Sequence, residues 1–124
     1  MKNLNNYIIE MDCTLLQAVH CIQSNNSRAA IVINNIDNKN KVVGVISEGD
    51  IMRALLHGSD IHSMLTQFIK HDFKYLNQKN YKDALELFKT YGISLIPIID
   101  DDLFLSDVIT LSDLFENTIL KDNK

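Results

Sequence analysis

A hydroxyl residue followed three positions later by an aspartate occurs twice in the chain. The first pair is Ser47 with Asp50 and the second is Thr110 with Asp113, and each pair directly follows the dipeptide Val-Ile. At the start of a helix such a pair forms a capping box, because each side chain can bind the backbone N–H of the other residue. Helix capping alone would explain one pair, but two pairs in equivalent surroundings indicate a shared binding function.

The residue types in these pairs suit the binding of a nucleotide. The free N–H groups and the positive dipole end at a helix start attract phosphate, and a Ser or Thr hydroxyl adds a donor. An aspartate in the first turn can accept hydrogen bonds from both hydroxyls of a ribose, and apolar strand residues nearby can enclose a purine. We therefore expect Ser47, Asp50, Thr110 and Asp113 to bind ligand.

Cationic residues distinguish the two pairs. Arg28 and Arg53 belong to the first half of the chain, and their counterparts in the second half are Ser94 and Glu116. The second half also carries the acidic run 100–102, which opposes the binding of phosphate. We expect the first site to bind nucleotide more tightly, with Arg28 and Arg53 among its ligand-binding residues. In the alternative, both arginines are solvated surface residues, and Arg28 could also serve either site.

An internal repeat places these pairs on equivalent elements. Aligning Ala18 with Ala84 puts Ile33 on Ile99 without a gap. In both halves, apolar residues at helical spacing precede a short apolar run, a polar connection, a second apolar run and another helical pattern. The expected helices are residues 14–24, 47–57, 80–91 and 110–117, and the expected strands are residues 29–33, 42–46, 95–99 and 104–109. The sequence thus predicts an α/β (α+β) fold in which a helix–strand–strand–helix unit is used twice.

Local signals mark the ends of these elements. Thr14 with Gln17 forms a capping box, Asn80 is a good N-cap, and Gly92 can take the left-handed conformation that ends a helix. Polar residues 34–41 and 100–102 are expected to connect the strands of the two hairpins. Residues 60–76 join the repeats, and we expect a short helix there followed by a short strand near residues 73–76.

Composition limits the classes of function. The 124 residues suffice for one domain, and 46% of them are hydrophobic. With 12 basic and 16 acidic residues, the chain lacks the basic surface that nucleic acid requires. It has no apolar run long enough to span a membrane. Residues 1–6 lack the apolar stretch of a signal peptide, so we expect a cytoplasmic protein.

Catalytic and metal sites are not expected. Catalysis needs an acid, a base or a nucleophile within mutual reach, and no such arrangement is evident. Cys13 and Cys21 fall on one predicted helix, where they cannot reach good disulfide geometry. We interpret them as two small buried thiols; the alternative is a weak metal site with His20, which no metal-binding spacing supports.

The sequence resembles the cystathionine-β-synthase (CBS) domain family over nearly its whole length. The stretches that carry the resemblance are Val43-Gly44-Val45-Ile46-Ser47, followed by Asp50, and Ile96-Pro97-Ile98-Ile99-Asp100 in the second half. Asp107 replaces the glycine expected before the second motif, and Ile31 replaces the proline of the first strand. The resemblance implies a CBS pair, or Bateman module, with repeats at residues 7–62 and 63–120 related by a pseudo-twofold axis.

This resemblance also implies a ligand and partners. The ligand would be AMP, ADP or ATP, sometimes S-adenosylmethionine, with Asp50 and Asp113 on ribose and Ser47 and Thr110 facing phosphate. Such modules pair as homodimers and regulate an attached or partner protein. Residues 47–58 resemble the CBS segments that accompany sugar-phosphate nucleotidyltransferases and sugar-phosphate isomerases. The alternative is an assembly module that binds no nucleotide and only dimerises a host enzyme.

Overall fold

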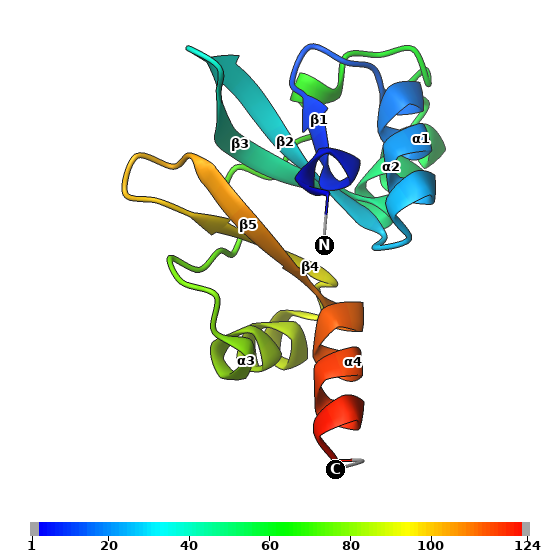
Figure 1. Ribbon diagram of the computed structural model, residues 1–124. Helices are drawn as coiled ribbons and strands as arrows, with labels where there is room; N and C mark the ends of the chain where they lie inside the picture. The colour runs from blue at the N-terminus through cyan, green and yellow to red at the C-terminus, as the bar shows by residue number, and fades with distance from the viewer. Residues whose placement is uncertain (1–2, 123–124) are drawn as a thin grey trace.

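The computed structural model describes the backbone of residues 3–122 and the side chains of residues 3–116. Two α/β units lie with their sheets facing each other and their helices on the outer sides (Figure 1). The first unit contains β1 (Ile8–Glu10), α1 (Leu15–Asn25), β2 (Ala29–Ile36), β3 (Lys39–Ser47) and α2 (Glu48–Leu56). The second contains α3 (Tyr81–Tyr91), β4 (Leu95–Ile99), β5 (Leu105–Thr110) and α4 (Leu111–Asp122). Two 3-10 helices, η1 (Leu4–Tyr7) and η2 (Leu65–Gln67), precede the units.

The predicted caps mark where the first helix of each unit begins and where α3 ends. The backbone N–H of Gln17 donates to Thr14 Oγ1 at 3.3 Å, and the Thr14 N–H donates to Gln17 Oε1 at 2.9 Å. Asn80 accepts from the N–H of Asp83 at 3.1 Å at the start of α3. Gly92 ends α3 with a φ of 64°, which a residue without a Cβ adopts at little cost. These sequence predictions are confirmed.

The first hairpin is tighter than the sequence suggested. β2 and β3 pair as far as Ile36 and Lys39, so most of the expected polar connection 34–41 is strand. The turn consists of Asp37 and Asn38, both left-handed with φ of 52° and 63°. A two-residue turn with two positive φ angles matches the right-handed twist of the strands, and Asp and Asn tolerate this conformation. The expectation of a longer loop was therefore wrong.

An additional first strand precedes the predicted unit. β1 pairs in parallel with β2, with Ile8 opposite Ile31. In the second unit its equivalent is a single parallel bridge between Leu76 and Ile98, in place of the expected strand near residues 73–76. The predicted helix–strand–strand–helix unit is confirmed in both repeats, and the added pairing makes each repeat β-α-β-β-α-like. Three-residue parallel pairing gives little sequence signal, because its hydrogen bonds are made to a distant strand.

Three buried clusters hold the layers together. One lies between the first sheet and helices α1 and α2, and another lies between β4–β5 and helices α3 and α4. The middle cluster joins the two sheets and contains Ala29, Ile31, Ile33, Val42, Leu95, Ile99 and Val108. The strands predicted at residues 29–33 and 95–99 are buried along their whole lengths, as expected. Cys13 and Cys21 are only partly buried, so the prediction of buried thiols was wrong.

Equivalent hydrogen bonds and bulges reveal the symmetry between the repeats. The N–H of Glu48 donates to the carbonyl of Arg28 at 2.9 Å, and the N–H of Leu111 donates to the carbonyl of Ser94 at 3.0 Å. The register also shifts after Val32 in β2 and after its repeat counterpart Ile98 in β4. The fold therefore consists of two similar units, as the internal repeat predicted.

Two absences hold for the part of the chain that the structure describes. None of its helices has both the length and the apolar character needed to cross a membrane. Within the same residues, no group of three or more His, Cys, Asp or Glu side chains is placed to hold a metal ion.

Candidate ligand-binding cleft

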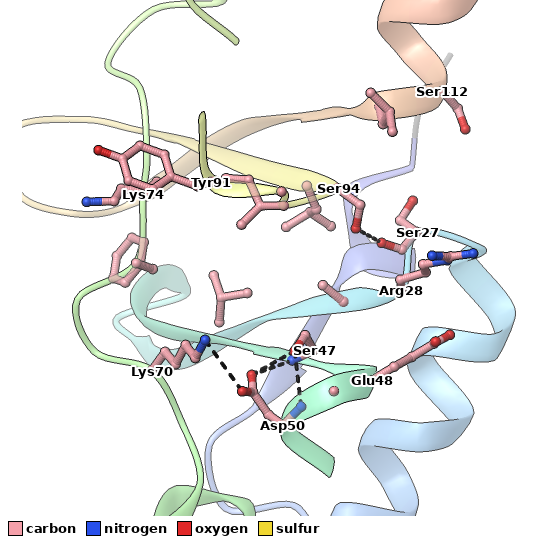
Figure 2. A pocket seen from close by; sticks show the side chains of 18 of the residues that line it. Ser27, Arg28, Ser47, Glu48, Asp50, Lys70, Lys74, Tyr91, Ser94 and Ser112 are labelled. Atoms are coloured by element: carbon pink, nitrogen blue, oxygen red, sulfur yellow. Dashed lines mark hydrogen bonds and ion pairs between the residues drawn. The ribbon is translucent and has the colours of Figure 1, made fainter. Parts of the chain in front are cut away.

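A cavity of about 940 Å³ lies between the two repeats. Its walls come from the α1–β2 turn, the start of α2, the segment 70–74 that joins the repeats, the end of α3 and the start of α4. Figure 2 shows side chains from both repeats directed toward this space. The volume falls in the range of about 300–1,000 Å³ that is typical of small-molecule sites.

Ser47 and Asp50 form the floor of this cleft at the start of α2. The backbone N–H and the hydroxyl of Ser47 both donate to Asp50 Oδ2 at 2.9 Å. The N–H of Asp50 donates in return to Ser47 Oγ at 3.2 Å. The Asp50 side chain is 8% exposed, so this capping box presents a largely buried carboxylate at the edge of the cavity.

Two cations compensate the charge of Asp50. The Arg53 guanidinium, one turn further along α2, donates to Asp50 Oδ1 at 2.6 Å. The Lys70 ammonium approaches the same oxygen at 3.7 Å from the segment that joins the repeats. Arg53 lies over Gly49 and is not among the residues that line the cavity, whereas Lys70 is. The Arg53 guanidinium therefore contacts Asp50 from outside the cavity, whereas the Lys70 ammonium can also contact a ligand inside it.

Gly44 explains how the joining segment reaches the cleft. A Cβ at position 44 would lie 2.0 Å from Ile69 Cγ2 and 2.7 Å from the Lys70 carbonyl oxygen. Because this space is free, Lys70 makes two backbone hydrogen bonds with Val45 of β3, at 3.1 and 3.2 Å. The glycine of the first motif therefore allows the backbone of the joining segment to lie close against β3.

Arg28 lies in the turn between α1 and β2, beside the start of α2, because its carbonyl accepts the N–H of Glu48. Its φ of 62° is left-handed, a conformation that residues other than glycine adopt rarely. Its repeat counterpart Ser94 lies next to it, because the Ser94 hydroxyl donates to the carbonyl of Ser27. The equivalent turns of the two repeats thus meet at the cleft, and Arg28 is its cation on this side (Figure 2).

Apolar and aromatic side chains line the remaining walls. Phe73 comes from the joining segment, Tyr91 from the end of α3, and Leu111 and Phe115 from α4. The Lys74 ammonium lies 4.4 Å from the centre of the Tyr91 ring, a cation–π contact. These flat surfaces offer an apolar slot, and the three cations offer anion partners beside the carboxylates of Glu48, Asp50 and Asp72.

The second pair lies outside this cavity. Thr110 caps α4, because the Asp113 N–H donates to its Oγ1 at 3.2 Å and the Thr110 N–H donates to Asp113 Oδ2 at 2.9 Å. Thr110 is 3% exposed, and neither residue is among those that line the cleft described above. Of the sequence-predicted residues, the cleft gathers Ser47, Asp50 and Arg28.

The family model of the CBS domain matches residues 3–57 and 78–118. The chain belongs to the CBS domain family. The match covers both halves of the internal repeat, so the protein is a tandem CBS pair, as the sequence resemblance implied.

Relatives and solved structures place the pair among known proteins. A 17.7 kDa protein of Acidianus ambivalens is 28% identical over 109 residues, which cover 87% of this chain and 64% of that protein. A Helicobacter pylori protein is 37% identical over 95 residues, covering 71% of this chain and 26% of that protein. The CBS pair thus spans less than two thirds of either relative. A CBS domain protein from Pyrobaculum aerophilum complexed with AMP has the same fold, with a TM-score of 0.76, 20% identity and coverage of 98% and 97% of the two chains.

Sequence reasoning missed the residues that the joining segment brings to the CBS pair's cleft. Lys70, Phe73 and Lys74 lie in the segment between α2 and α3, where no motif marked them. Two signals could have found them. The alternation of lysine with an aromatic residue suits an anion and a base, and Gly44 indicated that another backbone approaches β3.

Proposed function

We propose that the cleft of this CBS pair binds an adenine nucleotide of the AMP, ADP or ATP class and thereby regulates an attached or partner protein. The observation that carries the proposal is the meeting of Ser47 and Asp50 with three cations, Arg28, Lys70 and Lys74, in one cavity between the repeats. We place the repeats at residues 7–62 and 63–120. The module itself performs no catalysis.

Each part of a nucleotide has a partner in this cleft. Asp50 offers a carboxylate for the ribose hydroxyls, and Arg28, Lys70 and Lys74 offer cations for phosphate. Phe73 and Tyr91 offer surfaces on which a purine can stack. The AMP complex of the structurally similar Pyrobaculum protein supports AMP as the first ligand to test.

The first site is proposed to be the tighter one. Ser47, Asp50 and Arg28 share the cavity, while Thr110 and Asp113 lie outside it. Arg53 acts on the ligand through Asp50, since its guanidinium contacts that carboxylate. Asp100 accepts hydrogen bonds from the N–H groups of two neighbouring residues in the β4–β5 turn, so part of the acidic run serves the turn.

Thermal unfolding with AMP, ADP and ATP tests the proposal. A ligand at about 100 times its dissociation constant stabilises the folded state by about 2.7 kcal/mol, which raises the melting temperature by several degrees for a domain of this size. GMP at the same concentrations serves as the control for nonspecific phosphate binding. If no adenine nucleotide raises the melting temperature at millimolar concentration, the proposal is wrong.

An assembly module is the second candidate. On α2 the side chains of Met52 and Leu56 are 59% and 78% exposed, and on α4 Phe115 is also exposed. Such apolar helix faces favour association with a second copy or with a host enzyme. Sugar-phosphate nucleotidyltransferases and isomerases are the first partners to test, because residues 47–58 resemble the CBS segments that accompany them.

A further inference from the structure

The carboxylate of Asp50 has partners on both oxygens before any ligand arrives. Oδ2 accepts two hydrogen bonds from Ser47, and Oδ1 faces the cations of Arg53 and Lys70. A ribose hydroxyl that binds this carboxylate must therefore approach Oδ1, where the Lys70 ammonium competes for the remaining acceptor position. The Ser47 bonds belong to the helix cap and Arg53 is held at 2.6 Å within the same helix, so Lys70, at 3.7 Å, is the partner most easily displaced.

Lys70 combines a fixed backbone with an exposed side chain, so its ammonium can change partners while its backbone stays in place. Its two hydrogen bonds to Val45 fix the main chain against β3. Its side chain is 61% exposed and extends along the wall of the cleft to Asp50 (Figure 2). A lysine ammonium is a mobile point charge on a flexible stem, so Nζ can move from a carboxylate to a phosphate in the same cavity.

The other cations of the cleft are placed differently. Arg28 lies in the α1–β2 turn, where its carbonyl accepts the N–H of Glu48, and the Lys74 ammonium stacks over the ring of Tyr91. Within the described residues, Lys70 is the cleft-lining cation that is paired with the candidate ribose acceptor. When a ribose hydroxyl displaces Lys70 from Asp50, the ammonium becomes free to bind a phosphate, so the sugar contact and the phosphate contact form together.

We propose that Lys70 is a specificity-determining residue that makes the cleft select nucleotides over unphosphorylated nucleosides, by moving from Asp50 to a ligand phosphate. This inference rests on the proposed nucleotide-binding function. A nucleoside that displaces Lys70 breaks its ion pair with Asp50 and offers the ammonium no other anion. A nucleotide supplies a phosphate in exchange, and Lys70 also screens that phosphate from the Asp50 carboxylate.

Isothermal titration with AMP and adenosine tests this role in the full chain. Lys70→Met should lower the affinity for AMP by about tenfold or more, which is the loss expected for one charge-assisted hydrogen bond to phosphate. The affinity of the Lys70→Met variant for adenosine should stay the same or rise, because the ribose no longer competes with an ammonium for Asp50. Lys70→Arg should retain the preference for AMP. Lys82→Met is the matched control, since Lys82 is exposed on α3 and does not line the cleft.

The outcomes separate this inference from the function on which it rests. If wild-type protein binds AMP and Lys70→Met keeps the wild-type ratio of AMP to adenosine affinity, the role of Lys70 is refuted while nucleotide binding stands. Equal loss of both ligands would assign Lys70 to general support of the cleft and would also refute the inference. If wild-type protein binds neither adenosine nor any of AMP, ADP and ATP, both proposals fail. Lys70→Gln provides the same comparison should Lys70→Met not fold.

Discussion

The hydroxyl of Ser94 in the second repeat donates a hydrogen bond to the backbone carbonyl of Ser27 in the first. Both residues lie in the turn that leads from the first helix of a repeat into its buried strand. This side-chain bond joins the equivalent turns of the two repeats directly at the wall of the cleft. Together with the buried cluster between the two sheets, this contact holds the repeats in position around the cleft.

Replacing Ser94 by alanine should therefore affect both stability and binding. Loss of one partly buried hydrogen bond costs about 1 kcal/mol of unfolding free energy, measurable by urea denaturation. Ser106→Ala is the matched control, because the Ser106 hydroxyl donates to the Ile98 carbonyl within one repeat. Both variants should be destabilised, but only Ser94→Ala should also lower the affinity for AMP. Equal AMP affinity in the two variants would show that the contact between the turns does not shape the cleft.

The two aspartates of the repeated motif should differ in their importance for binding. Asp50→Ala should abolish most AMP binding in titration calorimetry, and Asp113→Ala should leave the tighter site nearly intact. The variants are matched controls for folding, since each removes a carboxylate that accepts the N–H of a cap residue at 2.9 Å. A larger loss of affinity in Asp113→Ala than in Asp50→Ala would overturn the assignment of the tighter site.

Gly44→Ala should destabilise the protein and disturb the cleft. The new methyl group would collide with Ile69 and with the Lys70 carbonyl, so the joining segment must move away from β3. Overpacking of this kind costs about 1–3 kcal/mol. Gly49→Ala is the control for stability, because the closest atom to its Cβ is the flexible end of Arg53 at 3.3 Å. Chemical denaturation that gives equal stabilities for the two variants would contradict the close approach at Gly44.

Self-association should occur through the helix faces. We expect a homodimer of the 14.2 kDa chain that uses parts of residues 14–24, 50–57, 82–91 and 113–120, although side chains from residue 117 onward lie outside the described part. Leu56→Glu places a charge in the exposed apolar face of α2 and should shift the mass toward the monomer in light scattering. Gln67→Glu, a similar change at an exposed position of η2, should not. A monomeric wild-type protein at high micromolar concentration would refute the dimer.

The two thiols should react slowly in the native protein at mildly alkaline pH. Burial raises the pKa of the Cys21 thiol, and the nearby Cys13 raises it further. Burial, followed by the charge of Asp12, raises the pKa of the Cys13 thiol. Thiolate is the reactive species, so iodoacetamide labelling at pH 8, followed by mass spectrometry, should be slower for folded than for urea-unfolded protein. Equal rates in the two states would contradict these shifts.

The same shifts predict a loss of stability at alkaline pH. A thiol pKa that is higher in the folded state means that folding favours the protonated form. The resulting stabilisation is complete below the unfolded thiol pKa of about 8.5 and is lost as the pH rises through the folded pKa. Replacing both cysteines by alanine should flatten the fall in unfolding free energy above pH 8.5. An unchanged slope in the double variant would assign that fall to other groups.

The sequence by itself determined the features that adjacent residues encode. Caps at Thr14, Ser47 and Asn80, and the buried strand Leu95–Ile99, follow from hydrogen bonds and apolar patterns within a few residues. The gapless repeat extended those local signals to a tandem fold. The sequence also singled out Ser47, Asp50 and Arg28 as candidates, and the structure places all three at one cleft.

Only the tertiary structure decided what lies next to these elements. The parallel pairing of β1, the crossing of Lys70 over Gly44 and the bond between Ser94 and Ser27 join residues that are distant in the chain. Such contacts form when separate apolar faces pack together, and no short window of sequence records which faces meet. For the same reason the motifs could not show that Lys70 would be paired with Asp50, because that distance is set by the docking of the joining segment on β3.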